Sequence, residues 1–241
     1  MTRLILACLF LLGMMGTVTG MASARQTETN VDIAAISETV LEAGPEALAA
    51  GLETPPDDAI LPEGFINPPS GVSENAEIIE QFTGVVGGIN NIEGATSNVS
   101  HAFETDPAIV PGLFSTGIIT YVVTDAAIDA GVVDEYEMNA LQRVGTATPA
   151  SGAESGATPS AVAPESSVQR IDINGTEAVL ATVNIGLGGV SAILQNVAVP
   201  VGNTLVIGTV LVADQGEVDR EQVLAFAEAL TLAGVEHLGT V

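Results

Sequence analysis

The stretch that decides the fold runs from Ala178 to Ala213 and reads AVLATVNIGLGGVSAILQNVAVPVGNTLVIGTVLVA, without one formal charge. Polar residues, glycines and one proline divide it into apolar pieces of roughly ten residues, about half of the 20 or so that a transmembrane helix needs. Gly186 and Gly188 resemble a dinucleotide-binding loop, but no acidic residue follows before Asp214, and the next residues do not favour a helix. We therefore interpret the stretch as the interior of a β-sheet.

Turn residues set the ends of four strands in and around this stretch. Asn174-Gly175 suits a type I′ turn, in which both central residues have positive φ, and predicts a β-hairpin. Glycines within 186–189 interrupt the chain again, and Gly202-Asn203 forms a second tight turn. These signals predict a four-stranded antiparallel meander. Its strands cover residues 168–173, 176–185, 190–199 and 204–213.

The last of these strands is apolar on both faces, a pattern typical of a strand that is covered on both sides of its sheet. One face carries Leu205, Ile207 and Leu211, and the other carries Val206, Val210 and Val212. A C-terminal helix is predicted to supply one cover, and Asp219 with Gln222 resembles a capping box at its start. Gly234 is predicted to end this helix. Its apolar face consists of Val223, Phe226, Ala227 and Leu230.

Residues 25–59 are predicted to be a helical lead-in and connector. Apolar residues recur at helical spacing between Val31 and Leu52, and Gly44-Pro45 divides them into two short helices. A partly disordered lead-in is the alternative interpretation.

The main domain is predicted over residues 60–241. It opens with a short edge strand or extended segment at 59–65 and continues with a helix capped by Ser73. Alternating or β-branched residues predict further strands. These strands cover residues 97–104, 117–124 and 134–142.

These elements together predict an α+β fold, in which an antiparallel β-meander sheet is covered by helices in the manner of an α/β/α sandwich. Residues 145–167 consist almost wholly of Ala, Ser, Thr, Gly and Pro. Such a segment buries too little apolar area to offset its ordering entropy, which predicts a flexible loop or linker within the domain. Two small domains, over residues 60–144 and 168–241, are the alternative.

The first 24 residues have the three parts of a secretory signal peptide. Arg3 precedes an apolar run over residues 4–15, and Ala22-Ser23-Ala24 offers small residues for cleavage after Ala24. An uncleaved anchor helix and lipidation of Cys8 are the alternatives. Cleavage removes the only cysteine, which excludes disulfides and thiolate chemistry from the mature chain. We expect the protein in the periplasm, on the cell exterior or in the medium, without a membrane span in its mature chain.

The charge of the chain limits the partners that it can bind. Five arginines and no lysine stand against 30 acidic residues, for a net charge of −25. Nucleic acids and anionic lipid surfaces both require clustered basic residues, which this sequence lacks. A basic partner or divalent cations remain electrostatically compatible with it.

The phrases IDINGTEAVLATV and VAVPVGNTLVIGTVLVAD, followed by a closing helix, resemble exported bacterial proteins of the PsbP-like α/β/α sandwich type. The resemblance covers at most residues 60–241 and concerns layout and hydrophobic pattern. It implies a mainly non-catalytic role, in which the protein binds a partner or assists an assembly. No local motif matches, so the resemblance assigns no site residue.

Few residues of the mature chain are suited to acid–base chemistry. His101 shares a strand face with Val99 and Phe103 and is interpreted as a packed or edge histidine, while His237 is placed after the last helix, near the surface. Neither a G-x-S-x-G nor an H-E-x-x-H motif occurs. We therefore predict no catalytic residue, no cofactor and no cofactor-binding residue.

An acidic group before the C-terminal helix is a weak candidate for metal binding. Asp214, Glu217 and Asp219 superficially resemble part of a calcium loop, but Ala225 stands where such a loop has its final glutamate. An acidic helix start that interacts favourably with the helix dipole is the preferred interpretation.

These observations predict an exported, non-catalytic binding or accessory protein, whose partner is another envelope or extracellular protein. The alternative is a carrier that holds a lipid or another small molecule in an apolar pocket between sheet and helix. A hydrolase is a further alternative, because carboxyl groups with shifted pKa values support catalysis without cysteine or histidine.

Overall fold

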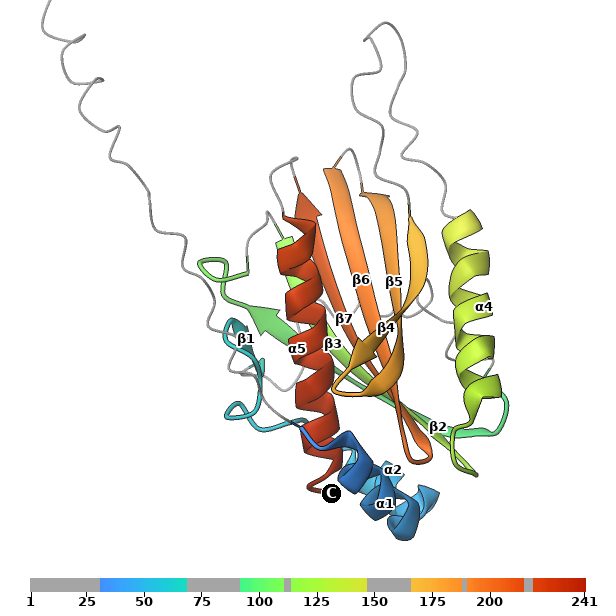
Figure 1. Ribbon diagram of the computed structural model, residues 1–241. Coiled ribbons are helices and arrows are strands. Elements are labelled where there is room, and N and C mark those ends of the chain that lie inside the picture. The colour runs from blue at the N-terminus through green and yellow to red at the C-terminus, as the bar shows by residue number, and fades with distance from the viewer. Residues whose placement is uncertain (1–30, 69–91, 111–113, 147–165, 188–189, 215–218) are drawn as a thin grey trace, which may run out of the picture.

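The computed structural model describes residues 31–68, 92–110, 114–146, 166–187, 190–214 and 219–241. The described part contains four α-helices and a seven-stranded antiparallel sheet, which confirms the predicted α+β class (Figure 1). The predicted signal peptide, the helix predicted after Ser73 and residues 147–165 of the low-complexity segment lie outside the described residues.

The helices and strands have the following bounds in chain order. The helices are α1 (Ile33–Ala43), α2 (Pro45–Gly51), α4 (Ala130–Thr146) and α5 (Arg220–Leu238). The strands are β1 (Phe65–Ile66), β2 (Ala95–Thr105), β3 (Phe114–Thr124), β4 (Ser167–Ile173), β5 (Thr176–Leu187), β6 (Val190–Val201) and β7 (Thr204–Asp214). In space the strands follow the order β1-β2-β3-β7-β6-β5-β4, so β7 is the central strand.

The four-stranded meander predicted from the charge-free stretch is confirmed as β4 to β7. Asn174 and Gly175 have φ values of 51° and 82°, as a type I′ turn requires, and they join β4 to β5. Gly202, with φ of 61°, lies in the tight turn between β6 and β7. The turn residues therefore set the register of the meander.

Strand β7 also pairs with β3 along its whole length, in register from Phe114 opposite Ala213 to Val123 opposite Thr204. Strands on both sides of residues 147–165 thus belong to one sheet. Strand β1 lies at its edge, where an edge strand was predicted, but it begins only at Phe65. The turns at the strand ends support this pairing, because Thr124 N donates to Asn203 O at 2.8 Å.

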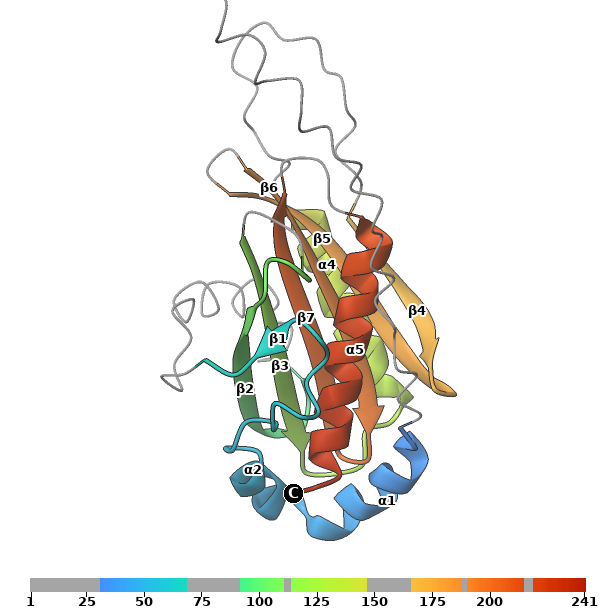
Figure 2. The same cartoon turned by 90° about the vertical axis from the view of Figure 1, so that its left-hand side faces the viewer.

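Helices cover both faces of the sheet, and β7 contributes to the core on each side. Val206, Val210 and Val212 pack in a core with Phe226 and Leu230 of α5, which we name the α5-side core. Leu205, Ile207 and Leu211 pack in a second core with Val133 and Tyr136 of α4, the α4-side core. Figure 2 shows α5 and α4 on opposite sides of the strands. The two-sided burial predicted for this strand is confirmed.

The strand predicted at residues 134–142 is wrong, because these residues belong to helix α4. The apolar and acidic residues also fit a period of 3.6, since Val133 and Tyr136 are buried while Asp134 and Met138 are exposed. Asp129 marks the start of this helix, because its carboxylate accepts hydrogen bonds from the backbone N–H groups of residues 131 and 132, at 2.8 and 3.2 Å.

The helix end predicted at Gly234 is also wrong, because α5 continues to Leu238 and Gly239 is its C-cap. Gly234 is a packing residue: a Cβ atom there would lie 2.8 Å from side-chain carbons of Ile119 and Val206. The absence of a side chain lets the helix approach β3 and β7 closely.

The N-terminal lead-in forms the two predicted helices at one end of the sheet. Gly44, with φ of 78°, separates α1 from α2, and Pro45 stands at the first position of α2. Apolar residues of both helices are buried in the α5-side core. These are Ile33 and Val40 of α1 and Leu48 of α2, and the C-cap residue Leu52 is buried with them. Figures 1 and 2 place α1 and α2 next to the C-terminal end of α5.

We predict that Gly208→Ala lowers the free energy of unfolding by at least about 1–3 kcal/mol. An added Cβ would lie 2.2 Å from Thr231 Oγ1 and 2.6 Å from the Thr231 backbone nitrogen, so α5 would have to move off the sheet. Urea denaturation measures the loss. Gly131→Ala is the control, because Gly131 is exposed in the first turn of α4 and an added Cβ would meet only the exposed Asp129 carboxylate, at 3.0 Å. This change should alter stability by less than about 1 kcal/mol. Equal effects of the two changes would contradict the packing role of Gly208.

Candidate functional site

Both histidines of the chain lie against the same buried tyrosine, which sequence reasoning did not predict. His101 projects from β2, Tyr121 from β3 and His237 from α5. The ring centroids of His101 and Tyr121 are 6.3 Å apart, and those of Tyr121 and His237 are 6.1 Å apart. Tyr121 is fully buried between them. We name this group the His–Tyr–His cluster.

The three side chains of the cluster each form a hydrogen bond to a main-chain carbonyl oxygen. His101 Nε2 lies 2.7 Å from Leu52 O, and His237 Nε2 lies 3.0 Å from Thr54 O. A carbonyl oxygen only accepts hydrogen bonds, so each Nε2 carries the proton and donates it. The Tyr121 hydroxyl donates to Gly234 O at 3.4 Å. The two imidazoles therefore bind the turn that follows α2.

Burial governs the protonation of this cluster. It lowers the pKa of His101 and of His237, although the bonds to Leu52 and Thr54 act in the opposite direction. The nearby charge of His101 lowers the pKa of His237 further. Burial raises the pKa of Tyr121 far above its ordinary value, so its hydroxyl stays protonated at neutral pH. The cluster is thus neutral near neutral pH.

The prediction that His237 lies near the surface after the last helix is wrong, because His237 is a buried residue of α5. The misplacement followed from ending the helix at Gly234. Counting on from Leu230 by seven residues, two helical turns, places His237 on the same buried face. His101 is a packed histidine on the strand face of Phe103, as predicted.

Asp219 acts as the N-cap of α5, because its carboxylate accepts a hydrogen bond from Glu221 N at 2.9 Å. The Asp214 side chain and Glu217 lie outside the part of the chain that the structure describes. Within that part, no group of three or more His, Cys, Asp or Glu side chains is arranged to hold a metal ion. The position of Asp219 agrees with the preferred interpretation, an acidic helix start.

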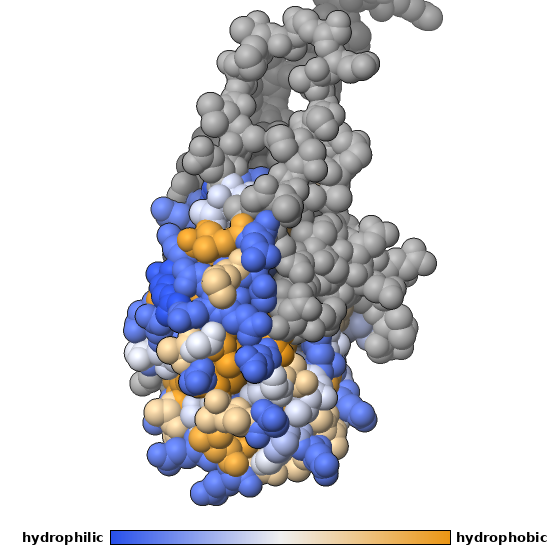
Figure 3. All heavy atoms as spheres, turned by 90° about the vertical axis from the view of Figure 1, so that its right-hand side faces the viewer, coloured by the Kyte–Doolittle hydropathy of each residue, from blue (hydrophilic) through white to orange (hydrophobic). Residues whose placement is uncertain are grey.

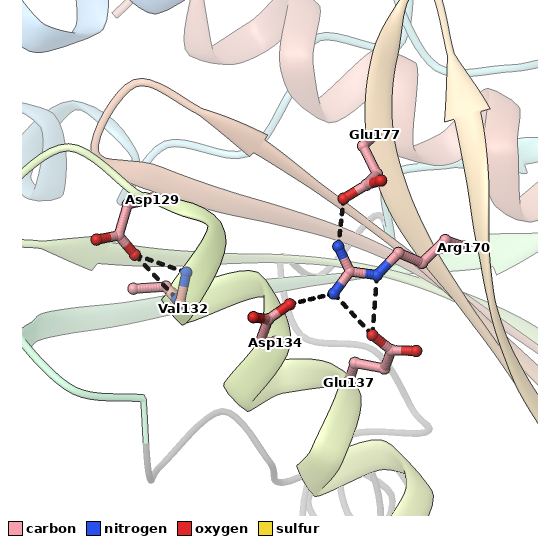
Figure 4. A network of polar contacts seen from close by, with 7 residues as sticks. Asp129, Val132, Asp134, Glu137, Arg170 and Glu177 are labelled. Atoms are coloured by element: carbon pink, nitrogen blue, oxygen red, sulfur yellow. Dashed lines mark hydrogen bonds and ion pairs between the residues drawn. The ribbon is translucent and has the colours of Figure 1, made fainter.

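A network of ion pairs ties α4 to the outer strands of the meander (Figure 4). Arg170 on β4 binds Glu137 through Nε at 2.9 Å and also pairs with Asp134 and Glu177. Hydrogen bonds to these three carboxylates raise the pKa of Arg170 above its ordinary value. Arg220, at the start of α5, donates to Asn184 Oδ1 at 2.9 Å. Both arginines with described side chains thus bind groups of their own chain.

Glu228 on α5 is a carboxyl group whose pKa is raised, and the cause is burial. A catalytic pair would place a second carboxyl group beside it. Among the described residues, no hydrogen bond or ion pair connects Glu228 to another side chain.

Hydrophilic residues cover much of the described surface on the side of α4, with apolar residues in several small groups (Figure 3). Met138 and Leu141 of α4 are among the exposed apolar side chains, at 57% and 49% exposure. Single exposed apolar side chains are common on protein surfaces. No described helix is long and apolar enough to cross a membrane.

Comparison with known proteins finds no family model that matches this chain and no curated protein with a matching sequence.

We predict that Asp219→Ala lowers stability by about 1 kcal/mol through loss of the helix cap, in chelator and in calcium alike. Asp219→Asn is the matched variant, because asparagine caps a helix equally well but is a poorer calcium ligand. It should stay within a few tenths of a kcal/mol of the parent chain. Thermal denaturation with and without calcium measures both effects. A loss of stability in Asp219→Asn as large as that in Asp219→Ala would contradict the capping role, and a calcium-dependent stabilisation that Asp219→Asn abolishes would contradict the predicted independence of calcium.

Proposed function

We propose that the protein is an exported, non-catalytic binding or accessory protein, and that its partner is a basic protein of the envelope or the extracellular space. Three features support this proposal: the packing role of both histidines, the negative net charge and the predicted signal peptide.

The observation that carries the proposal is the His–Tyr–His cluster. The chain has two histidines, no lysine and a single cysteine within the predicted signal peptide. Both histidine Nε2 atoms bind main-chain carbonyls that hold the turn after α2. Catalysis near neutral pH usually depends on a tuned base, an activated nucleophile or a metal. The histidines are instead used to hold one part of the fold against another.

The surface charge supports a basic partner. The net charge is −25, and the described guanidinium groups of Arg170 and Arg220 are engaged within the chain. A surface of one sign attracts partners of the opposite sign and accelerates their association at low ionic strength. The predicted signal peptide supports export, and the resemblance to PsbP-like proteins supports a role in assisting an assembly.

One observation favours the carrier alternative. Asn196 on β6 is 4% exposed and lies on the same sheet face as Leu194 and Ala198 of the α4-side core. Its Oδ1 atom is buried, and the described residues offer it no hydrogen-bond partner. A buried acceptor of this kind normally binds water or a ligand group.

The experiment that tests the function is affinity capture by the mature chain from envelope extract of the producing organism, with native mass spectrometry of the same sample. We expect a stoichiometric protein partner whose binding weakens as salt rises. An unrelated exported protein of equal net charge is the control for unspecific attraction. A bound small molecule, released by an Asn196→Leu change, would favour the carrier. Turnover of an envelope substrate that Glu228→Gln abolishes would contradict both.

A further inference from the structure

We propose that the His–Tyr–His cluster is a pH-sensitive clasp, which holds the helical segment of residues 31–54 on the sheet at neutral pH and releases it in mild acid. The inference concerns how the chain holds its own segment, so it does not depend on the proposed function.

Three side chains outside residues 31–54 form the described hydrogen bonds to the backbone of this segment. Asn174 Nδ2 donates to Val31 O at 3.3 Å, at the start of the segment. The other two are His101 and His237, which bind Leu52 O and Thr54 O at its end. Two imidazoles from different elements thus hold carbonyls only two residues apart, so the far end of the segment depends on both.

The segment needs this attachment because its helices are short. Helix α1 has 11 residues and α2 has seven, and isolated helices of this length are marginal in water. Docking brings Val40 against the Gly202 turn, and Gly51 against Val241. The segment is therefore folded only while it is docked, and the two histidine bonds add to the docking that its buried apolar residues provide.

The charged and titratable groups around the clasp do not offset a positive charge on the rings. Tyr121, from β3, is neutral at this pH. The carboxylates nearest to the clasp along the chain are Glu53, in the exposed turn, Glu104, on β2 with His101, and Glu236, beside His237 on α5. None of them bonds to a ring, and the charge that acts on the pKa of His237 is that of His101. The carboxylates on the helices of the segment, Glu38, Glu42 and Glu46, are not bonded to the rings either.

The direction of the pH effect follows from the lowered pKa values of both histidines. Release of the segment returns the rings to water and to a pKa near 6.5, so the released state binds protons more readily than the docked state. Docking is complete above pH 6.5 and weakens as the pH falls below this value towards the docked-state pKa. Two titrating groups reduce the docking constant by up to about a hundredfold per pH unit.

Hydrogen exchange of the full chain between pH 7.5 and pH 5, corrected for the intrinsic pH dependence of exchange, tests the clasp. We expect protection of residues 31–54 to fall at least about tenfold below pH 6.5, while β6 and β7 keep theirs. Constant protection of the segment over this range would overturn the proposal, and so would a loss that β6 and β7 share equally.

The decisive variant is His101→Gln with His237→Gln, because the glutamine amide donates to the same carbonyls but does not titrate. Its segment should stay protected at both pH values. If this double variant does not fold, His101→Gln alone should reduce the pH dependence from two protons to one. Asn174→Ala is the control, which should weaken docking equally at every pH. An acid loss of protection in the glutamine variants equal to that of the parent chain would contradict the clasp.

Discussion

The burial of β7 on both faces is the constraint on which the rest of the structure depends. This strand has no charged side chain between Thr204 and Ala213 and carries apolar side chains on both faces. Exposure of either face to water would destabilise the fold, so another element must cover each of them. Gly208 has no side chain, so α5 packs directly against the backbone of β7 at this position. The Gly208 N–H donates a hydrogen bond to Thr231 Oγ1 of α5 at 3.1 Å. The same threonine hydroxyl also lies 3.1 Å from Val197 O of β6. One polar side chain therefore fastens α5 to two central strands.

The position of α5 then determines what lies at the end of the sheet. Gly234 lets the helix approach β3, which brings His237 beside Tyr121 and within reach of the turn after α2. Both histidines of the chain thereby take a packing role. On the other face, Arg170 of β4 holds α4 against the meander through two carboxylates of the helix, those of Asp134 and Glu137. Exposed ion pairs of this kind are screened by salt, so α4 depends mainly on Val133 and Tyr136.

The sequence was most informative where local chemistry determines conformation. Asn174-Gly175 and Gly202 favour tight turns through their own backbone preferences, and the structure has turns at both places. The apolar pattern on both faces of β7 indicates a strand inside the sheet, and β7 is the central strand. The prediction failed where one pattern fits two periods, as at 134–142, and where a glycine ends a helix in one context but packs within it in another, as at Gly234. The His–Tyr–His cluster was out of reach, because its members are 20 and 116 positions apart and meet only through pairing of β2 with β3 and docking of α5.

The pairing of β3 with β7 joins strands from before and after the low-complexity segment into one sheet, so these strands should unfold as one cooperative unit. Native-state hydrogen exchange as a function of denaturant tests this most directly. We expect the amides of β3, β6 and β7 to exchange only through global unfolding, with a single free energy for all three strands. If the amides of β3 exchange through an opening of lower free energy, while those of β6 and β7 remain protected, β7 does not unite the two parts and the account is contradicted.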